Sequence, residues 1–324
     1  MSTFRNPIAN VDTPDPFVTY DKETGYYYAL FTLGNRLEIF RHKKVANIIS
    51  DGETKVIFLA DGEKYGIYGD IWAPEMHKGS DGGWYIYTSG RIRPEPSEKR
   101  IFVMRALSSD PFGEWEFAGI PTPDVFSIDP TSYVDKNGVQ YMCNSRVDRT
   151  FGQVLDIYKM KNPTELDTKS RETIAIAELS WETVPPYVNN RAIVEGAFFI
   201  EKNGRLYIIY SANGCWSDHY VLGVLEHMGG DLCNKANWKK HKEPLLVFGN
   251  GAFGPGHASF FYSPNGKELW CAYHALNRHN EHNVYDKRYL NLQRVDFDES
   301  GYPVMGVCVG NSVDIPCPGA ESED

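Results

Sequence analysis

Five polar side chains recur at nearly the same place along this chain, each eight to ten positions ahead of a glycine turn. They are Asp15, Glu75, Asp129, Glu195 and His257. Two carboxyl groups with different pKa values, one protonated and one ionised, are what hydrolysis of a glycosidic bond requires. A single Asp or Glu at such a place could equally start a turn. Five in phase favour a shared chemical site, because gathering like charges is unfavourable unless chemistry needs them.

The elements that must position these groups form a fivefold repeat, in which each glycine turn is followed by an aromatic-rich strand. The turns lie 55 to 66 residues apart, at Gly25, Gly83, Gly138, Gly204 and Gly266. This spacing suits a small antiparallel sheet of about four strands, the size of a propeller blade. The sequence therefore predicts an all-β, five-bladed β-propeller, whose innermost strands bring the five polar groups to one central channel.

Composition favours the same fold and a single domain. The 324 residues include 14% aromatic residues, 29 Gly and 19 Pro, a balance typical of short strands joined by turns. The repeat runs without a break in composition, so we expect one domain over residues 1–324, with blade repeats at about 10–310 and a short acidic C-terminal tail. The six cysteines show no zinc-like spacing, and free, mostly buried thiols are expected.

Charge and hydropathy exclude some classes of partner. The formal net charge of −10 argues against nucleic acid, because binding to phosphates depends on Lys and Arg. No apolar stretch of membrane-spanning length is present, so no membrane partner is expected. The first residues lack the basic and apolar regions of a secretory leader. We expect a cytoplasmic protein for the chain as it stands, and a secreted or periplasmic one if a leader has been removed.

Several motifs, taken in order, resemble those of glycoside hydrolase family 43, the inverting α-L-arabinofuranosidase, arabinanase and β-xylosidase group. They cover roughly residues 6–305 and read NPI, TPDPFV, IWAPEMHK, SIDPTSYVDKNG, IVEGAFFIEKNGRLYIIYS and GPGHASFF. The resemblance implies that Asp15 is the general base, that Glu195 is the general acid, and that Asp129 sets the pKa of the acid and orients it. Glu75 is left without a catalytic role, and we take it as structural.

Substrate-binding residues follow partly from the resemblance. It implies that Arg288 binds the sugar in the reactive subsite and that Trp72 is a pocket aromatic. Arg294 competes with Arg288, and we expect it to point outward into a salt bridge. Because aromatic rings stack on sugar faces, Trp216 and Phe31 are further candidates. His274 is also a candidate binding residue, with a satisfied core histidine or a channel-lining one as the interpretations its sequence context favours.

The resemblance also implies that His257 coordinates a structural calcium ion in the channel. The alternative is a histidine hydrogen-bonded to a channel carboxylate such as Asp129, because calcium prefers six to eight oxygen ligands. No cofactor is expected to be required for the chemistry.

The expected function is removal of α-L-arabinofuranosyl units from arabinan or arabinoxylan oligosaccharides of the plant cell wall, with inversion. A β-D-xylosidase or an endo-arabinanase of the same family is the alternative within this class. From another class, a non-catalytic propeller could bind a glycan or a protein across its face. The trio of Asp15, Asp129 and Glu195 favours an enzyme, since a pure binding module has no need to gather these groups.

Overall fold

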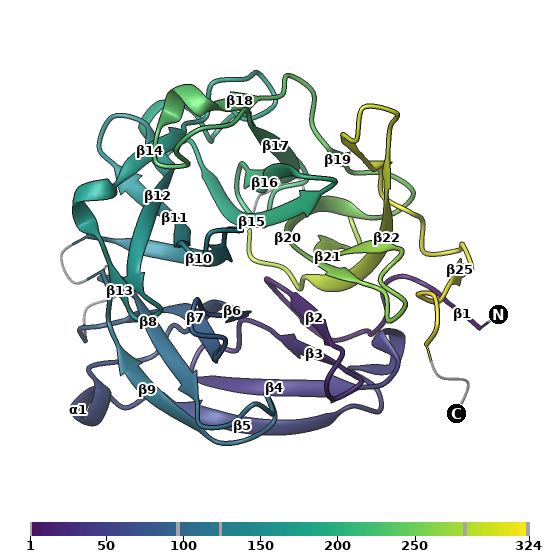
Figure 1. Ribbon diagram of the computed structural model, residues 1–324. Helices are drawn as coiled ribbons and strands as arrows, with labels where there is room; N and C mark the ends of the chain where they lie inside the picture. Colours follow the sequence, from purple (N-terminus) through teal and green to yellow (C-terminus); the bar gives the residue numbers. More distant parts are fainter. Residues whose placement is uncertain (1, 95–97, 123–124, 281–283, 322–324) are drawn as a thin grey trace.

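The computed structural model describes residues 2–94, 98–122, 125–280 and 284–321. Five antiparallel sheets surround a central axis, which confirms the five-bladed β-propeller (Figure 1). The first two blades are β2 (Phe17–Asp21), β3 (Tyr26–Leu30), β4 (Arg36–His42) and β5 (Glu53–Leu59), then β6 (Trp72–Lys78), β7 (Trp84–Arg91), β8 (Lys99–Ala106) and β9 (Trp115–Gly119). The third blade is β10 (Ser127–Val134), β11 (Gln140–Asp148), β12 (Gly152–Asn162), β13 (Glu165–Leu166) and β14 (Glu172–Ala175).

Blade four carries extra short strands at its outer edge, whereas blade five has four strands. Blade four is β15 (Val194–Lys202), β16 (Arg205–Ala212), β17 (Val221–His227), β18 (Trp238–Lys240), β19 (Leu246–Val247) and β24 (Gly306–Val307). Blade five is β20 (Phe253–Tyr262), β21 (Leu269–Leu276), β22 (Tyr289–Phe297) and β23 (Pro303–Val304). The helical turns are α1 (Gly62–Tyr65), η1 (Val45–Asn47), η2 (Thr168–Ser170), η3 (Asn189–Arg191) and η4 (Lys235–Asn237). Among the described residues, no helix is long and apolar enough to cross a membrane.

Aromatic side chains pack the blades against one another. The strands with the aromatic-rich sequences are the second of each blade, and both their faces are buried between neighbouring sheets. Phe58 of blade one, for example, lies 5.3 Å from Phe102 and 6.2 Å from Phe117 of blade two, measured between ring centroids. Because both faces are covered, these strands read as nearly continuous apolar runs rather than as strict alternation.

A β-bulge interrupts the innermost strand pair at the same place in blades two to five. Within or just before each innermost strand, a residue at a corresponding place has a positive φ of 46–56°: Asp15, Ala73, Asp129, Gly196 and His257, and β20 has a second one, Gly254. The sequence spacing had placed Glu75 and Glu195 at these positions. That alignment is wrong, because the two glutamates lie at different places in the bulge. Glu195 is one residue before Gly196, the positive-φ residue of blade four, whereas Glu75 is two residues after Ala73, the positive-φ residue of blade two.

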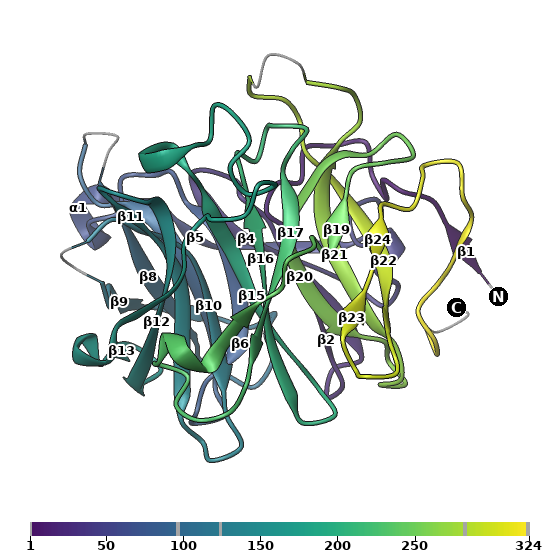
Figure 2. The ribbon, with the colours of Figure 1, turned by 90° about the horizontal axis from the view of Figure 1, so that it is seen from above.

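The N-terminal segment closes the ring against blade five. The backbone N–H of Ile8 donates to the Leu290 carbonyl at 3.0 Å, and that of Thr13 donates to the Arg288 carbonyl at 2.7 Å. Beyond this contact, β1 (Thr3–Phe4) pairs with β25 (Ile315–Pro316), and the two lie together at the edge of the molecule in Figures 1 and 2. The two ends of the propeller are therefore joined beside the channel.

Candidate active site

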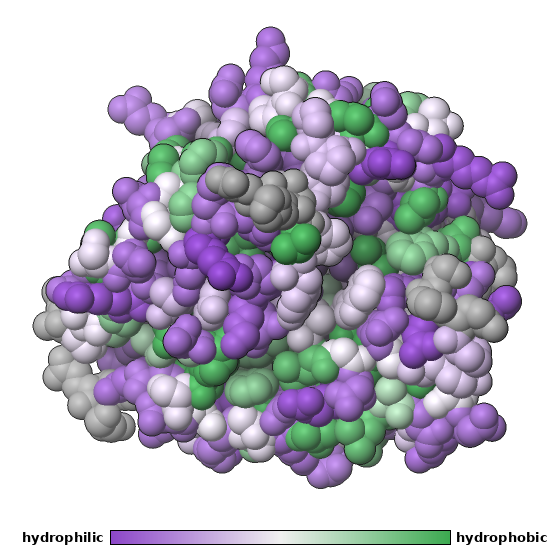
Figure 3. Space-filling view, turned by 180° about the vertical axis from the view of Figure 1, so that it is seen from behind, coloured by the Kyte–Doolittle hydropathy of each residue, from purple (hydrophilic) through white to green (hydrophobic). Residues whose placement is uncertain are grey.

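A cavity of about 170 Å³ lies where the innermost strands begin. The loops around it are on the face turned away from the viewer in Figure 1, and Figure 3 shows that face hollowed near its middle. It is lined by Asp15, Thr32, Trp72, Ile128, Asp129, Gln153, Ile193, Glu195, Gly214, Cys215, Trp216, His257 and Arg288. All five blades contribute, so residues far apart in the sequence share one small chamber.

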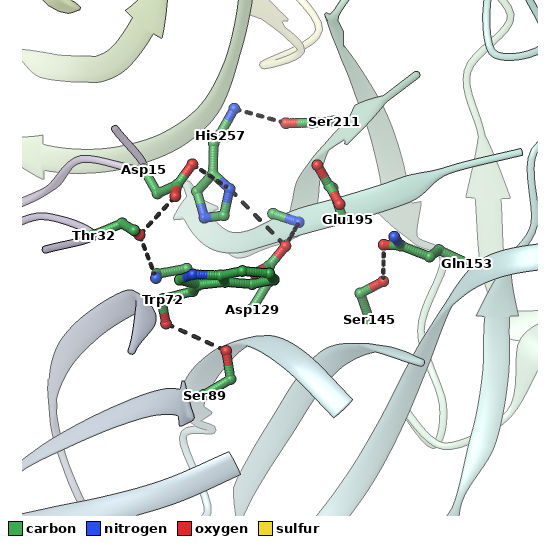
Figure 4. Close-up of polar contacts among 12 residues, drawn as sticks. Asp15, Thr32, Trp72, Ser89, Asp129, Ser145, Gln153, Glu195, Ser211 and His257 are labelled. Atoms are coloured by element: carbon green, nitrogen blue, oxygen red, sulfur yellow. Dashed lines mark hydrogen bonds and ion pairs between the residues drawn. The ribbon is translucent and has the colours of Figure 1, made fainter. Parts of the chain in front are cut away.

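Asp15 is held as an ionised carboxylate. Thr32 Oγ1 donates to its Oδ2 at 2.6 Å, and Arg288 Nη1 donates to its Oδ1 at 2.9 Å (Figure 4 shows the first of these bonds). Burial raises the pKa of Asp15, but Arg288 above all, with the hydrogen bond from Thr32, outweighs it and holds the pKa well below its usual range. An ionised, fixed carboxylate can take a proton from water, as a general base must.

Glu195 has the opposite character. Its side chain is buried, and Tyr220 donates a hydrogen bond from its hydroxyl to Oε1 at 2.9 Å. Burial raises the pKa of Glu195 to about 7; the Tyr220 hydrogen bond lowers it, and the negative charge of Asp15 raises it further. A carboxyl group that keeps its proton near neutral pH can protonate a leaving oxygen.

Asp129 lies beside the residue that follows Glu195. The backbone N–H of Gly196, the residue after Glu195, donates to Asp129 Oδ2 at 3.2 Å, and in the view of Figure 4 this carboxylate lies between Asp15 and Glu195. Burial raises the pKa of Asp129 to about 8, and the neighbouring Glu195 raises it as well. Two buried carboxyl groups this close disfavour double ionisation, so the pair retains a proton near neutral pH.

His257 faces the carboxylates through one ring nitrogen. Its Nδ1 lies 3.4 Å from Asp15 Oδ1 and 3.9 Å from Asp129 Oδ2, and its backbone N–H donates to Ser211 Oγ at 2.8 Å. Within the described part of the chain, no three His, Cys, Asp or Glu side chains are grouped to hold a metal ion. On protein ligands alone these residues do not fit calcium, which prefers six to eight oxygens.

Trp72, Trp216 and Arg288, three of the expected binding residues, lie on the cavity wall. Trp72 sits at the start of β6, where its carbonyl accepts a hydrogen bond from Thr88 Oγ1 at 2.7 Å. Lys99 Nζ lies 3.5 Å from the centroid of the Trp72 ring. Trp216, on the loop between β16 and β17, is 38% exposed. The Trp72 ring is thus contacted by a lysine from outside the cavity lining, whereas the Trp216 ring is partly exposed to solvent.

Two other expected binding residues lie elsewhere, and we correct both. Phe31 is 2% exposed and packs in the core 5.3 Å from Phe40, outside the cavity lining. His274 is fully buried behind Asp15, whose backbone N–H donates to His274 Nδ1 at 3.1 Å. Neither side chain can stack on or bind a sugar from these positions.

Arg294 is placed as the sequence predicts, whereas Glu75 lies outside the cavity that holds the other four polar groups of the repeat. Arg294 points outward and forms a salt bridge with Asp296 at 3.0 Å. Glu75 Oε2 lies 2.7 Å from His77 Nε2, buried and outside the lining of the cavity.

Four residues of the site have no signal in the sequence. Thr32, Gln153, Cys215 and Tyr220 come from loops or strand ends next to the cavity, where no periodicity shows which way a side chain points. Thr32 also links two blades, since its hydroxyl accepts a hydrogen bond from the backbone N–H of Ala73 at 2.8 Å. Only their distance to the carboxylates, which the fold sets, identifies them.

A five-bladed propeller with an ionised carboxylate facing two buried, proton-retaining carboxyl groups has the architecture of a glycoside hydrolase. The chain belongs to glycosyl hydrolases family 43, whose sequence model matches residues 4–303. This confirms the resemblance seen in the motifs.

Individual relatives extend the comparison. An "extracellular exo-alpha-(1->5)-L-arabinofuranosidase" of Streptomyces avermitilis is 32% identical over 96% of this chain and 65% of its own length. "Alpha-L-arabinofuranosidase B" of Pyricularia oryzae is 31% identical over 81% of this chain and 54% of its own length. The chain thus spans between half and two thirds of these relatives. The solved structure of an α-L-arabinofuranosidase from Lactobacillus brevis shares the fold, with a TM-score of 0.85, 24% identity, and coverage of 96% of this chain and 98% of that chain.

Proposed function

We propose that the protein is an inverting glycosidase that removes terminal α-L-arabinofuranosyl units from arabinan or arabinoxylan oligosaccharides. The observation that carries this proposal is the opposite protonation of Asp15 and Glu195 around one small cavity. Hydrolysis with inversion needs one ionised and one protonated carboxyl group at the same time. The names of the relatives supply the sugar.

The reaction follows from these protonation states. Asp15 accepts a proton from a water molecule as that water attacks the anomeric carbon from the face opposite the leaving group. The bond from the anomeric carbon to the glycosidic oxygen breaks, and its electron pair stays on that oxygen, which takes the proton of Glu195. The products are a free sugar of inverted configuration and a shortened chain. Proton exchange with solvent then restores Asp15 and Glu195.

The size of the cavity supports removal of single sugars. Pockets for drug-sized ligands have volumes of about 300–1,000 Å³, and this cavity, at about 170 Å³, is smaller. A single monosaccharide is the ligand class that suits such a chamber, whereas an endo-acting enzyme needs an open cleft. Arg288, whose guanidinium reaches the cavity, has donors that suit sugar hydroxyls.

The experiment compares hydrolysis of aryl α-L-arabinofuranoside and aryl β-D-xyloside by the wild type and by Asp15→Asn. Preference for the arabinofuranoside, lost in Asp15→Asn, supports both the sugar and the base. Preference for the xyloside keeps the mechanism and replaces the sugar. The matched control is Asp135→Asn, in the turn between β10 and β11, where the carboxylate accepts only backbone hydrogen bonds and one from Asn137. This control is expected to retain full activity.

Binding without turnover would instead favour the non-catalytic propeller, and calorimetry with arabino-oligosaccharides separates the two classes. Calcium at His257 stays a prediction, tested by the change in melting temperature when EDTA and then calcium are added. The location of the protein also stays a prediction. The word "extracellular" in a relative's name supports export, and cell fractionation tests it.

A further inference from the structure

Tyr220 is a buried tyrosine that touches the general acid. It lies at the end of the loop between β16 and β17 and is 1% exposed. Its hydroxyl donates to Glu195 Oε1 at 2.9 Å. Its ring stacks on the imidazole of His274, with centroids 5.4 Å apart and planes inclined by 5°. One side chain therefore joins the acid to the layer of residues behind the cavity.

Blade five leaves room for this ring. A Cβ atom on Gly256 would lie 2.2 Å from Tyr220 Cε1, closer than atoms can approach. In the register of the bulges, Gly256 occupies the place that holds Trp72 in blade two and Glu195 in blade four. Blade five thus has no side chain at the position that faces the cavity in those blades, and Tyr220 fills the space. The ring lies between Gly256 and the imidazole of His274, and its hydroxyl donates to Glu195.

His274 links the same stack to the general base. The backbone N–H of Asp15 donates to His274 Nδ1 at 3.1 Å, so this nitrogen is an acceptor and the proton of the neutral ring is on Nε2. Burial lowers the pKa of His274 well below its usual value, and the nearby Arg288 lowers it further. The imidazole is therefore neutral and fixed. The stacked pair touches the backbone of the base at one end and the carboxyl group of the acid at the other.

We propose that Tyr220 is the positioning residue of the general acid, and that with His274 it forms a rigid bridge that fixes the acid relative to the base. Tyr220 occupies Oε1 of Glu195, which leaves Oε2 to carry the proton toward the leaving oxygen. The inference rests on the proposed function for its kinetic consequence, although the hydrogen bond itself does not depend on which sugar is cleaved.

The decisive test measures the titration of Glu195 without substrate. In protein labelled with ¹³C at the glutamate carboxyl carbons, the Glu195 signal is assigned as the one missing from Glu195→Gln. In Tyr220→Phe, the ionised carboxylate loses a hydrogen bond from a donor that favours it, so its pKa is expected to rise by about one unit. An unchanged titration in folded Tyr220→Phe overturns the proposal.

The matched control is Tyr207→Phe, which removes a hydroxyl from the same blade. Tyr207 is also buried, but its hydroxyl donates to the Gly301 carbonyl at 2.8 Å and has no part in the cavity. Its substitution is expected to leave the Glu195 titration where it is in the wild type. A shift as large as that in Tyr220→Phe would mean that any loss of packing in the blade moves this pKa, and would overturn the proposal.

The pH dependence of kcat gives a second test. A smaller amount of folded protein lowers the rate at every pH, but it does not change the pH at which kcat falls. The fall of kcat at alkaline pH reports the pKa of Glu195 in the complex with substrate, and in Tyr220→Phe it is expected to move upward by about one pH unit. At pH 6, kcat is expected to be about tenfold lower than in the wild type, and KM is expected to stay within a factor of two of the wild-type value. A lower kcat without this upward shift contradicts the positioning role. If the wild type does not cleave arabinofuranosides, the proposed function fails, and the titration still decides the role of Tyr220.

If Tyr220→Phe does not fold, replacement of Tyr220 by 2,3-difluorotyrosine gives a test of opposite sign. Fluorination makes the hydroxyl a stronger donor while the ring stays in place, so the pKa of Glu195 is expected to fall. A pKa that stays at the wild-type value or rises overturns the proposal.

Discussion

Arg288 Nη1 donates to Asp15 Oδ1 at 2.9 Å across 273 positions of sequence, so the last blade supplies the charge that keeps the carboxylate of Asp15 ionised. Arg288 immediately precedes β22, and its carbonyl accepts the backbone hydrogen bond from Thr13 that closes the ring. Closure of the propeller and ionisation of the base thus depend on the same residue. The active site cannot form until the two ends of the chain have met.

Replacement of Arg288 should make the rate fall at a higher pH on the acidic side of the pH–rate profile. In Arg288→Met, burial of Asp15 is no longer offset, so its pKa rises from well below the usual range toward or above the value of about 3.9 for a free Asp. Because the base must be ionised, kcat/KM at pH 5 should fall more steeply than at pH 7. The measurement is kcat/KM between pH 4 and 9.

Arg294→Met is the control for that experiment. Arg294 is on β22, six positions after Arg288, but its partner is Asp296 and both side chains are more than half exposed. Its pH profile should superimpose on that of the wild type. If the pH profile of Arg288→Met also superimposes on that of the wild type after both are scaled to the same maximum, Arg288 does not control the ionisation of Asp15.

Replacement of Glu195 should lower the rate most for substrates whose leaving group must be protonated to depart. In Glu195→Gln, hydrolysis of an arabino-oligosaccharide should fall by about 10²–10⁴. Hydrolysis of a 2,4-dinitrophenyl arabinofuranoside should fall far less, because that leaving group departs without protonation. The comparison is kcat/KM for the two substrates, and equal losses would assign Glu195 a role other than general acid.

Asp129 should reduce stability at alkaline pH. Its pKa is raised to about 8, so the folded protein holds a proton that the unfolded chain has released. This contribution to stability is fully present below the unfolded pKa of about 3.9 and is lost as the pH rises through about 8. Asp129→Asn should therefore melt about 2–5 °C above the wild type at pH 8.5, with a smaller difference at pH 5, while losing most of its activity. A difference that does not depend on pH would contradict the raised pKa.

Trp72 should contribute to affinity for the sugar. Pairs of aromatic rings gain about 0.5–1.5 kcal/mol beyond area burial, and a gain of this size between the Trp72 ring and a sugar face would make Trp72→Ala raise KM up to about tenfold, with a smaller effect on kcat. Lys99→Met tests the outer side of the same ring, because Lys99 Nζ lies 3.5 Å from its centroid. A fall in kcat with KM unchanged in Trp72→Ala would place this ring in the chemical step instead.

The sequence could predict the inner strands and the number of blades, because turn glycines mark them, and the ordered set of motifs picked out Asp15, Asp129 and Glu195, which the fold brings to one cavity. The sequence could not predict the bulge, because the extra residue is a backbone feature without a fixed residue type: Ala73, Asp129, Gly196 and His257 all occupy it. For this reason the count of positions placed Glu75 and Glu195 in one class, although only Glu195 lines the cavity.

The sequence also could not predict which way individual side chains point. Phe31 directly follows β3 and His274 lies on β21, but whether each faced the cavity or the core depended on where neighbouring blades packed. Tyr220 carried no signal at all, since the glycine that makes room for it is 36 positions later in another blade. Such contacts between loops and blades are set by the tertiary structure, which no local pattern reports.

The stereochemical course of hydrolysis should be inversion. The carboxylate of Asp15 accepts one hydrogen bond at each oxygen, from Thr32 at Oδ2 and from Arg288 at Oδ1. A carboxylate held in this way is poorly placed to form a covalent bond with the sugar but can accept a proton from water. With an aryl α-L-arabinofuranoside, proton NMR in the first minutes should show β-L-arabinofuranose before the anomers equilibrate. Early appearance of the α anomer would show that Asp15 acts as a nucleophile, and the assignment of the general base would have to change.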